Sequence, residues 1–349
     1  MSLMSCDKFD RHMPEWLSAL FGGELPQREG AFTEIGGRRI VLREGILRAV
    51  LPTSDAQKQT KDSFAFIWSS RDRFQGDDDL AFMGDWYRQM YGDVANAPWW
   101  ADYGERPILL DAGCGAGISA LGLFGSKLEE LRYLGIDIST AVEAAAQRFA
   151  GKGIDAAFLQ TSLLDVPIPE ESIDVIYSQG VLHHTDSTRE AIHALAKKLK
   201  VGGRFLFYVY KKKGPIREFT DDYIREKLQP MSPEQAWQAM LPLTKLGQYL
   251  GNLNIEIDVP EAIELLDIPA GKIDLQRFFY WHLFKAFHHT TWNQDELNHI
   301  NLDWFAPVNA HRQTPEEVRA WCGEVGLSIE REHIQESGVT IIARKAELT

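Results

Sequence analysis

Three glycines at alternate positions, Gly113, Gly115 and Gly117, form the most informative pattern in the chain. An apolar run that ends in Asp111 precedes them, and a predicted helix follows them. Glycine lets a strand-to-helix turn approach a ligand closely, and the N-terminus of the next helix adds free N–H groups and partial positive charge. The pattern predicts a nucleotide-like cofactor, although a tight structural corner or a dinucleotide site has the same signature.

Two further acidic residues, Asp137 and Asp165, stand at the ends of predicted strands over 131–137 and 156–159. Ligands of open α/β sheets bind beyond the carboxyl ends of the strands, where an acid can hold ribose hydroxyls. Asp137 has that role or caps a helix. Asp165 accepts from an exocyclic amine or caps the turn before Pro167.

Five blocks of the chain carry a family resemblance: Leu110–Gly117, Gly135–Ser139, Leu164–Pro167, Asp174–His184 and Leu199–Phe205. Together and in this order they resemble the class I S-adenosylmethionine-dependent methyltransferases, which have a Rossmann-like sheet of seven strands. The likeness runs through 107–210 and extends to 314–344. The N-terminal extension and the insertion indicate a bacterial-type member, and the implied cofactor is S-adenosylmethionine.

The resemblance also implies a role for individual residues around the glycine turn. Gly113 and Gly115 would contact the aminocarboxypropyl arm of the cofactor, with Asp111 near its ammonium group. Asp137 would hold the ribose hydroxyls, and Ile138 would pack on the adenine.

Four more residues receive roles from the same resemblance. Leu164 would meet the adenine face, and Asp165 would meet the adenine amine. Ser178 and Gln179 would border the methionine end of the cofactor.

Methyl transfer from a sulfonium needs alignment of an acceptor, exclusion of water and, for some acceptors, removal of a proton. No metal and no covalent nucleophile is therefore expected. His184 is the first candidate for a base and Tyr210 the second. For His183 and His184, hydrogen bonding within their own loop is the structural alternative.

Strand and helix signals alternate over 107–210, which predicts an α/β fold with a doubly wound, mostly parallel sheet. Closing strands are predicted over 327–333 and 338–344, and the family resemblance implies a sheet of seven strands with an antiparallel last strand. A predicted helix over 189–200 is expected to stop at Gly202 and Gly203.

The chain is expected to divide into three parts. Residues 1–106 form an N-terminal extension, with a small hairpin over 39–51 and a helical cap. Residues 107–210 and 314–349 form the cofactor-binding core, and the second of these begins with a helix capped by Thr314. Residues 211–313 form a helical insertion that serves as a substrate or lid region. Helices are expected there over 221–228, 233–240 and 273–289.

The N-terminal extension holds a second, shorter resemblance. Arg43–Arg48 is similar to the tail of a small zinc-ribbon-like module, but the paired cysteines are missing, so no zinc is implied. Gln57, Thr60, Phe64 and Trp68 resemble the segment that follows that module. This segment folds over the cofactor cleft as a lid or is a plain buried helix.

The insertion offers candidate substrate contacts. The run Phe278–His282 lines an apolar pocket or is a buried helix. Lys211 and Arg217 attract an anionic substrate or belong to a solvated basic patch. Asp303–Pro307 could close the pocket.

Composition limits the classes of partner. The 349 residues carry a net charge of -13, which argues against nucleic acid and, with the aromatic insertion, favours a small-molecule acceptor. Three scattered cysteines, and a polar N-terminal stretch without a signal-peptide core, predict a cytoplasmic protein. No apolar run predicts a membrane span. The oligomeric state is left open.

Two alternatives to a methyltransferase remain at this stage. An NAD(P)-dependent oxidoreductase would show G-x-G-x-x-G, but position 118 is Ile. A non-catalytic S-adenosylmethionine-binding protein would keep the same cleft. Whether the acceptor atom is O, N or C is not indicated.

Overall fold

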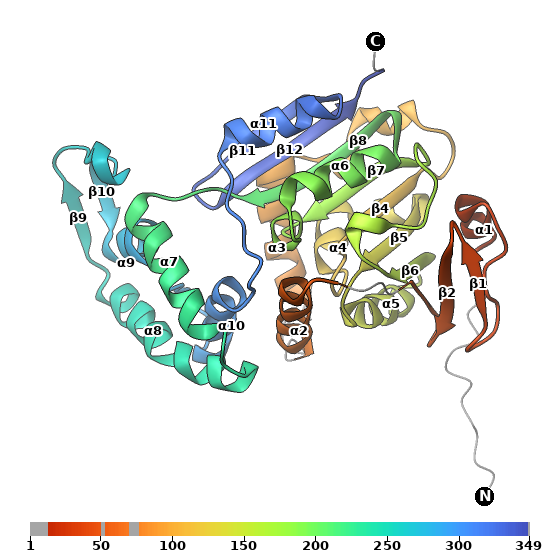
Figure 1. Ribbon diagram of the computed structural model, residues 1–349. Coiled ribbons are helices and arrows are strands. Elements are labelled where there is room, and N and C mark those ends of the chain that lie inside the picture. The colour runs from red at the N-terminus through yellow and green to blue at the C-terminus, as the bar shows by residue number, and fades with distance from the viewer. Residues whose placement is uncertain (1–12, 50–52, 70–76, 348–349) are drawn as a thin grey trace, which may run out of the picture.

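The computed structural model describes residues 13–49, 53–69 and 77–347, and within them one large sheet organises the fold (Figure 1). Its ten strands follow the order β1-β2-β3-β6-β5-β4-β7-β8-β12-β11. Seven of them form the predicted core: β4 (Ile108–Ala112), β5 (Arg132–Asp137), β6 (Ala156–Gln160), β7 (Ile173–Gln179), β8 (Leu199–Tyr210), β11 (Leu327–Ile334) and β12 (Gly338–Lys345). Neighbours among β4 to β8 pair in parallel, and β12 is antiparallel to both β8 and β11. The doubly wound α/β prediction, with an antiparallel last strand, is confirmed.

The three additional strands come from the N-terminal extension: β1 (Phe32–Ile35), β2 (Arg38–Arg43) and β3 (Ile46–Arg48). The predicted hairpin joins β2 to β3 through Glu44 and Gly45, which both have positive φ, as a tight hairpin turn requires. β3 then pairs in parallel with β6, through Leu47 opposite Leu159. The hairpin therefore extends the main sheet and covers the edge that β6 would otherwise expose.

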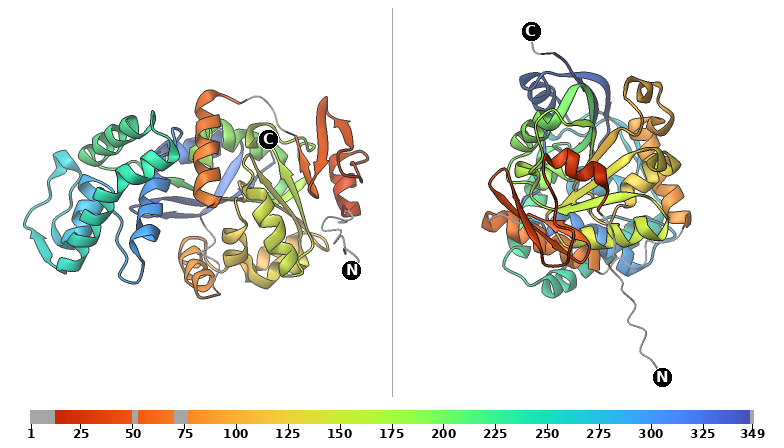
Figure 2. Two further views of the ribbon diagram at one scale, coloured as in Figure 1. Left: turned by 90° about the horizontal axis from the view of Figure 1, so that it is seen from below. Right: turned by 90° about the vertical axis from the view of Figure 1, so that its right-hand side faces the viewer.

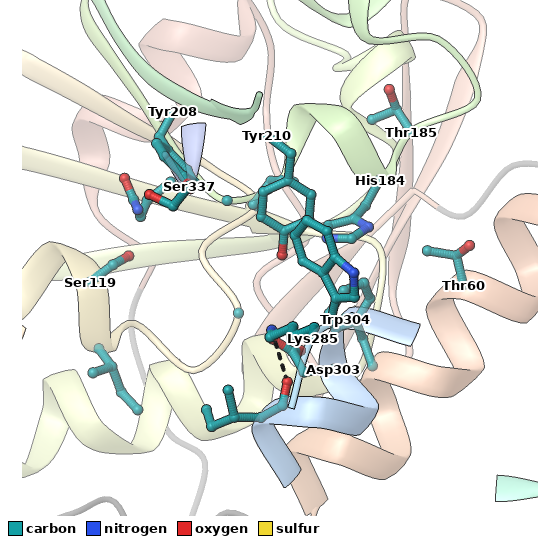
Figure 3. Close-up of a pocket in the computed structure, with 18 of the residues that line it drawn as sticks. Thr60, Ser119, His184, Thr185, Tyr208, Tyr210, Lys285, Asp303, Trp304 and Ser337 are labelled. Carbon is teal, nitrogen blue, oxygen red and sulfur yellow. Dashed lines mark hydrogen bonds between the residues drawn. The ribbon is translucent and has the colours of Figure 1, made fainter. Parts of the chain in front are cut away.

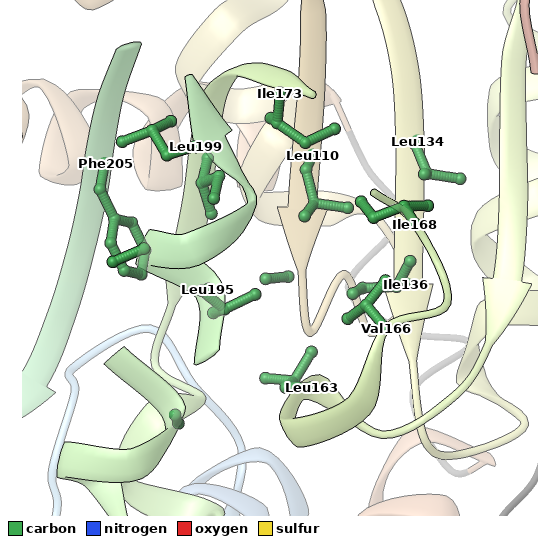
Figure 4. Packing of buried hydrophobic residues seen from close by; sticks show 14 of the residues in the cluster. Leu110, Leu134, Ile136, Leu163, Val166, Ile168, Ile173, Leu195, Leu199 and Phe205 are labelled. Atoms are coloured by element: carbon green, nitrogen blue, oxygen red, sulfur yellow. The ribbon is translucent and has the colours of Figure 1, made fainter. Parts of the chain in front are cut away.

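Helices cover both faces of the sheet. One face carries α1 (Glu15–Phe21), α6 (Thr188–Lys198) and α11 (Pro315–Glu324), and the other carries α3 (Asp77–Tyr91), α4 (Ile118–Phe124) and α5 (Ala141–Gly151). Successive residues of a strand point to opposite faces, so Leu110 belongs to the first core and Leu109 to the second. Figure 4 shows the first core, where Leu110 and Leu134 of the sheet meet Leu195 of α6.

The expected helix stop at Gly202 and Gly203 is wrong. The helix ends at Lys198, and both glycines lie inside β8, where the pairing with β7 shifts register. Gly202 has φ +81°, and a Cβ on Gly203 would lie 2.8 Å from the carbonyl oxygen of Asp174. The glycines therefore permit a bulge in a central strand.

The insertion forms a separate lobe. It contains α7 (Pro215–Leu228), α8 (Pro233–Leu253), α9 (Leu275–Phe278), α10 (Gln294–Phe305) and the antiparallel pair β9 (Glu256–Val259) and β10 (Gly271–Asp274). The expected helix over 273–289 is wrong, because β10 occupies its start, a π-turn follows over Phe279–Leu283, and Phe284 is extended. The side chain of Asp274 accepts from the backbone N–H of Arg277, so it caps a helix instead of continuing one.

Helix α2 (Asp55–Ser69) lies between the sheet and the insertion lobe (Figure 1). Figure 2 shows an elongated molecule, with this lobe at one end and the N-terminal hairpin at the other. Short 3-10 turns connect several elements, at Val94–Asn96, Pro98–Asp102, Gly125–Glu130, Leu163–Asp165, Leu182–His184 and Glu264–Leu266. Within the described ranges, no helix has the length and apolar character needed to cross a membrane.

A substitution at Gly117 tests this packing, because Gly117 has φ +77° and a Cβ at this position would lie 2.7 Å from the Phe149 ring. We expect Gly117→Ala to destabilise the protein by about 2–5 kcal/mol, from a left-handed backbone and an overpacked core. Gly153→Ala, with φ +71° and open space around the Cβ, should lose only the backbone part, about 1–2 kcal/mol. Urea unfolding measures both, and equal losses would contradict the packing argument.

Candidate active site

The glycine turn after β4 borders a cavity of about 780 Å³. Gly113 and Gly115 line this cavity, and both have positive φ. A Cβ on Gly113 would lie 2.3 Å from the side chain of Val181, which comes from the loop after β7. Only glycine therefore fits between that loop and the cavity.

Asp137 ends β5 and lines the same cavity, with Ile138 next to it. Its Oδ2 accepts from the backbone N–H of Gly115 at 2.9 Å, and its Oδ1 accepts from the N–H and hydroxyl of Ser139 at 2.8 and 2.7 Å. These three hydrogen bonds hold the carboxylate in place at the cavity. Burial raises the pKa of Asp137, and the hydrogen bonds from Ser139 and Gly115 oppose that rise.

Asp111 and Ser178 lie behind the turn and do not line the cavity. Asp111 is fully buried, accepts from the Tyr133 hydroxyl at 2.6 Å on Oδ2, and has no described partner on Oδ1. Burial raises its pKa to about 7. The Ser178 hydroxyl donates to the Ala112 carbonyl at 2.7 Å and ties β7 to β4. Both residues therefore hold the strands next to the turn in place, and neither is exposed to the cavity.

Leu164 and Asp165 also lie outside the cavity, contrary to the contacts that we expected of them. Leu164 packs against the first core, and Asp165 forms an ion pair with Arg38 of β2. The N-terminal hairpin thus engages the acid that the sequence suggested for the adenine amine. Ser162 and Leu163, which directly precede these two residues in the chain, line the cavity instead.

The end of β7 connects the cavity to the N-terminal extension. Gln179 lines the cavity, and its side-chain oxygen accepts from the Tyr91 hydroxyl of α3 at 2.6 Å. Helix α2 adds Gln57, Thr60 and Phe64 to the lining. The predicted lid segment therefore lies over the cleft, while the Trp68 side chain is outside the described residues.

Three hydrogen bonds fasten α2 to the segment after α10, and in one of them Gln59 Nε2 donates to the carbonyl of Ala306 at 3.0 Å. The side-chain oxygen of Gln59 accepts from the N–H of Val308 at 2.9 Å, and the Thr60 hydroxyl accepts from the N–H of Asn309 at 3.0 Å. The segment that begins at Asp303, which we expected to close the pocket, is thereby joined to the lid, and Asp303 and Trp304 line the cavity.

His184 and Tyr210 both line the cavity (Figure 3). His183 is fully buried and does not line it. His184 Nδ1 lies 2.6 Å from the carbonyl oxygen of Asn309, so this nitrogen carries the proton and Nε2 keeps its lone pair. Burial lowers the pKa of His184 to about 4, and burial raises the pKa of Tyr210 well above its usual value. The His183 ring stacks on the Tyr210 ring with 3.6 Å between the centroids, so His183 has a structural role in the loop.

The insertion supplies the far wall of the cavity. Trp304 lies 4.4 Å from Tyr210 between ring centroids, and the other large apolar rings of this wall are Tyr280, Trp281, Phe287 and Trp292. The aromatic run that we predicted as pocket or buried helix thus contributes to a pocket, although only part of it is helical.

Of the two cations suggested by the sequence, Arg217 lines the cavity and Lys211 does not. Lys211 pairs with Glu336. The buried guanidinium of Arg217 lies 5.4 Å from the ring centroids of both Tyr280 and Trp304, and its Nε donates to Asp221 at 2.9 Å. Lys213 and Lys285 line the cavity, and the sequence analysis assigned neither a role. A lone lysine within the aromatic stretch 278–287 was the signal available for Lys285.

Comparison with known proteins agrees with this geometry. Residues 110–207 match the model of a methyltransferase-domain family. The uncharacterized methyltransferase YcgJ of Bacillus subtilis is 28% identical over 172 residues, which cover 47% of this chain and 67% of that protein. The tRNA U34 carboxymethyltransferase of Hydrogenovibrio crunogenus is 33% identical over 103 residues, or 28% of this chain and 30% of that protein.

Among solved structures, magnesium protoporphyrin IX methyltransferase of Synechocystis PCC 6803 with bound S-adenosylhomocysteine aligns with a TM-score of 0.44 and 16% identity, over 84% of this chain and 100% of that one. The fold and site define an α/β enzyme that binds a nucleoside cofactor. The family match identifies residues 110–207 as a domain of the class I S-adenosylmethionine-dependent methyltransferases, with S-adenosylmethionine as its cofactor. The oxidoreductase alternative is thereby set aside.

The residues present fit that cofactor. Gly113 and Gly115 place no side chain at the cavity, and Asp137 presents there a carboxylate, a group that accepts hydrogen bonds from hydroxyls. We expect Asp137→Ala to weaken S-adenosylhomocysteine binding by about 1–3 kcal/mol in calorimetry, because it removes a charged acceptor. Asp165→Ala, which removes an acid outside the cavity, should leave the affinity unchanged. Equal effects of the two substitutions would remove Asp137 from the site.

Proposed function

We propose that this protein transfers the methyl group of S-adenosylmethionine to an O, N or C nucleophile of a small molecule. The observation that supports the proposal is one shared cavity: the glycine turn and Asp137 line one part, and the rings of the insertion line another. Its volume of about 780 Å³ lies within the range of about 300–1,000 Å³ typical of small-molecule sites. We assign 107–210 and 314–349 to cofactor binding and 211–313 to the acceptor.

The chain's own residues would hold the reactants in line and exclude water. When bound, S-adenosylmethionine supplies an electrophilic methyl group. Asp137 binds the ribose hydroxyls, and Gly113 and Gly115 admit the aminocarboxypropyl arm. Gln57, Thr60 and Phe64 of α2 cover the cleft and keep water from the reacting atoms.

His184 is the residue best placed to take a proton from the acceptor. Its Nδ1 proton is donated to the Asn309 carbonyl, so Nε2 is available as the acceptor of a proton. Its pKa of about 4 keeps the ring neutral at ordinary pH. Tyr210 fits a different role, because its raised pKa keeps the phenol protonated, and a neutral phenol donates a hydrogen bond and does not act as a base.

A labelling experiment tests the class of acceptor. The protein and S-adenosylmethionine with a radioactive methyl group are incubated with an extract of the source cells, separated beforehand into small molecules, RNA and protein. We expect label to enter the small-molecule fraction. Label confined to the RNA fraction would overturn the small-molecule proposal in favour of a tRNA-type acceptor, and no label in any fraction would favour the non-catalytic alternative.

The proposed base has its own test once an acceptor is known. We expect His184→Ala to lower kcat by about 10²–10⁴-fold, because positioned proton transfer contributes that much, with little change in S-adenosylmethionine affinity. His193→Ala, a substitution on α6 near Glu324 and outside the cavity, is the matched control and should keep wild-type kcat. Full turnover by the His184 variant would end the assignment.

The lowered pKa of His184 also predicts a pH dependence of stability. The unfolded-state pKa is near 6.5 and the folded-state pKa is about 4, so protonation favours unfolding. The contribution of the neutral ring is complete above pH 6.5 and is lost as the pH falls toward 4. Urea unfolding at pH 7 and pH 4.5 should therefore show a smaller loss of stability for His184→Gln than for the wild type. Parallel losses would contradict the shift.

A further inference from the structure

Two lysines in the acceptor half of the cavity are buried without a counter-ion. Lys213 follows β8 and is 9% exposed, and Lys285 precedes α10 and is 7% exposed. Both line the cavity, and Figure 3 shows Lys285 beside Asp303 and Trp304. Lysine is almost never buried unless it is paired, so each ammonium group needs an explanation.

Their hydrogen bonds go to backbone carbonyls only. Lys213 Nζ donates to the carbonyls of Glu336 and Ser337, and Lys285 Nζ donates to the carbonyl of Ile300 at 3.1 Å. In the part of the chain that the structure describes, no carboxylate lies within 4.0 Å of either nitrogen. An ammonium group has three donors, so at least one N–H of each lysine remains for a ligand.

Three of the nearby carboxylates already pair with other cations, although Glu336 and Asp303 line the same cavity. Glu336 pairs with Lys211, Glu218 with Arg312, and Asp221 with Arg217. Asp303 lines the cavity and attracts Lys285 from beyond ion-pair distance. Burial nevertheless lowers the pKa of both lysines to about 7, which reflects the cost of holding an unpaired charge there.

Aromatic rings lie against both cations. Lys213 Nζ is 5.8 Å from the centroid of the Trp281 ring, and Lys285 Nζ is 4.9 Å from that of Trp304. A flat ligand that packs on these rings would bring a substituent at its edge to an ammonium group. The wall thus combines apolar flat surfaces with positive charge, a combination that suits a planar anion.

We propose that the methyl acceptor is an aromatic molecule that carries a carboxylate or phosphate, and that Lys213 and Lys285 supply the charge that binds this group. The inference rests on the proposed function and narrows its substrate class. A neutral acceptor would leave both buried ammonium groups unpaired, whereas an anion compensates them in a site that excludes water. The oxygen atoms of either acidic group accept the remaining N–H donors.

Matched probes test the charge requirement without knowledge of the true acceptor. Naphthalene-2-carboxylate, 2-naphthyl phosphate and the neutral naphthalene-2-carboxamide are titrated by calorimetry into the protein saturated with S-adenosylhomocysteine. We expect at least one anion to bind about ten-fold or more tightly than the amide, a difference of about 1.4 kcal/mol. The two anions distinguish a carboxylate site from a phosphate site.

Lysine variants then locate the charge. Lys213→Met and Lys285→Met should each reduce the preference for the anion, and the double variant should abolish it. Lys212→Met and Lys272→Met remove exposed lysines outside the cavity and should keep the preference.

Thermal unfolding adds a second measurement. Without acceptor, the Lys285→Met variant should unfold at the wild-type temperature or above, because methionine fills similar space without a buried charge. This result would separate a ligand-binding role from a structural one.

Three results would overturn the inference: equal affinity for the anions and the amide, saturable binding by none of the three probes, or an anion preference that survives in the folded double variant. The binding of S-adenosylhomocysteine, which is measured before the probes are added, distinguishes a failure of this inference from a failure of the proposed function. If S-adenosylhomocysteine binds and the probes are not discriminated, only the acceptor class is wrong. If S-adenosylhomocysteine does not bind, the proposed function itself fails.

Discussion

The close approach of backbone at the carboxyl end of β4 is the constraint on which the rest of the site depends. Gly113 lies against Val181 and Gly117 against Phe149, both closer than any side chain would permit. These contacts fix the turn against the loop after β7 on one side and against α5 on the other. Asp137 then binds the N–H of Gly115, so the ends of β4 and β5 are held as one surface. Every other wall of the cavity is positioned relative to this surface.

The opposite wall is built in a different way. Arg217 and Asp221 are almost fully buried, yet each is satisfied: the guanidinium donates to the carboxylate, which also accepts from the Trp304 indole at 2.7 Å. This network holds α7 against α10 and orients the aromatic wall. Lys213 and Lys285 lie at the same wall without such compensation. The lobe therefore brings a compensated cation, Arg217, and two cations without an ion-pair partner to the same cavity.

The sequence predicted the core well because its signals are local. The apolar run before Asp111, the glycine spacing and the capping pattern at Thr314 each depend on residues a few positions apart, and the structure has the corresponding strand, turn and helix. The long-range contacts could not be predicted in this way. The pairing of β3 with β6, the ion pair of Arg38 with Asp165 and the bulge at Gly202 depend on partners distant in the chain. The same limit applies to the lysines, since burial and the lack of a counter-ion are properties of the assembled lobe.

The division of the chain explains why the cofactor is easier to identify than the acceptor. The proposed cofactor site would use backbone geometry and one carboxylate at the sheet edge, features that leave a recognisable spacing in the sequence. The proposed acceptor site would use side chains from β8, α10, the π-turn and α2, and Gln59 and Thr60 tie the lid to the segment after α10. A cavity closed by such contacts excludes water, and low local polarity strengthens any charge inside it. Acceptor selectivity is therefore expected to depend on a few buried charges and on the lid that keeps them dry.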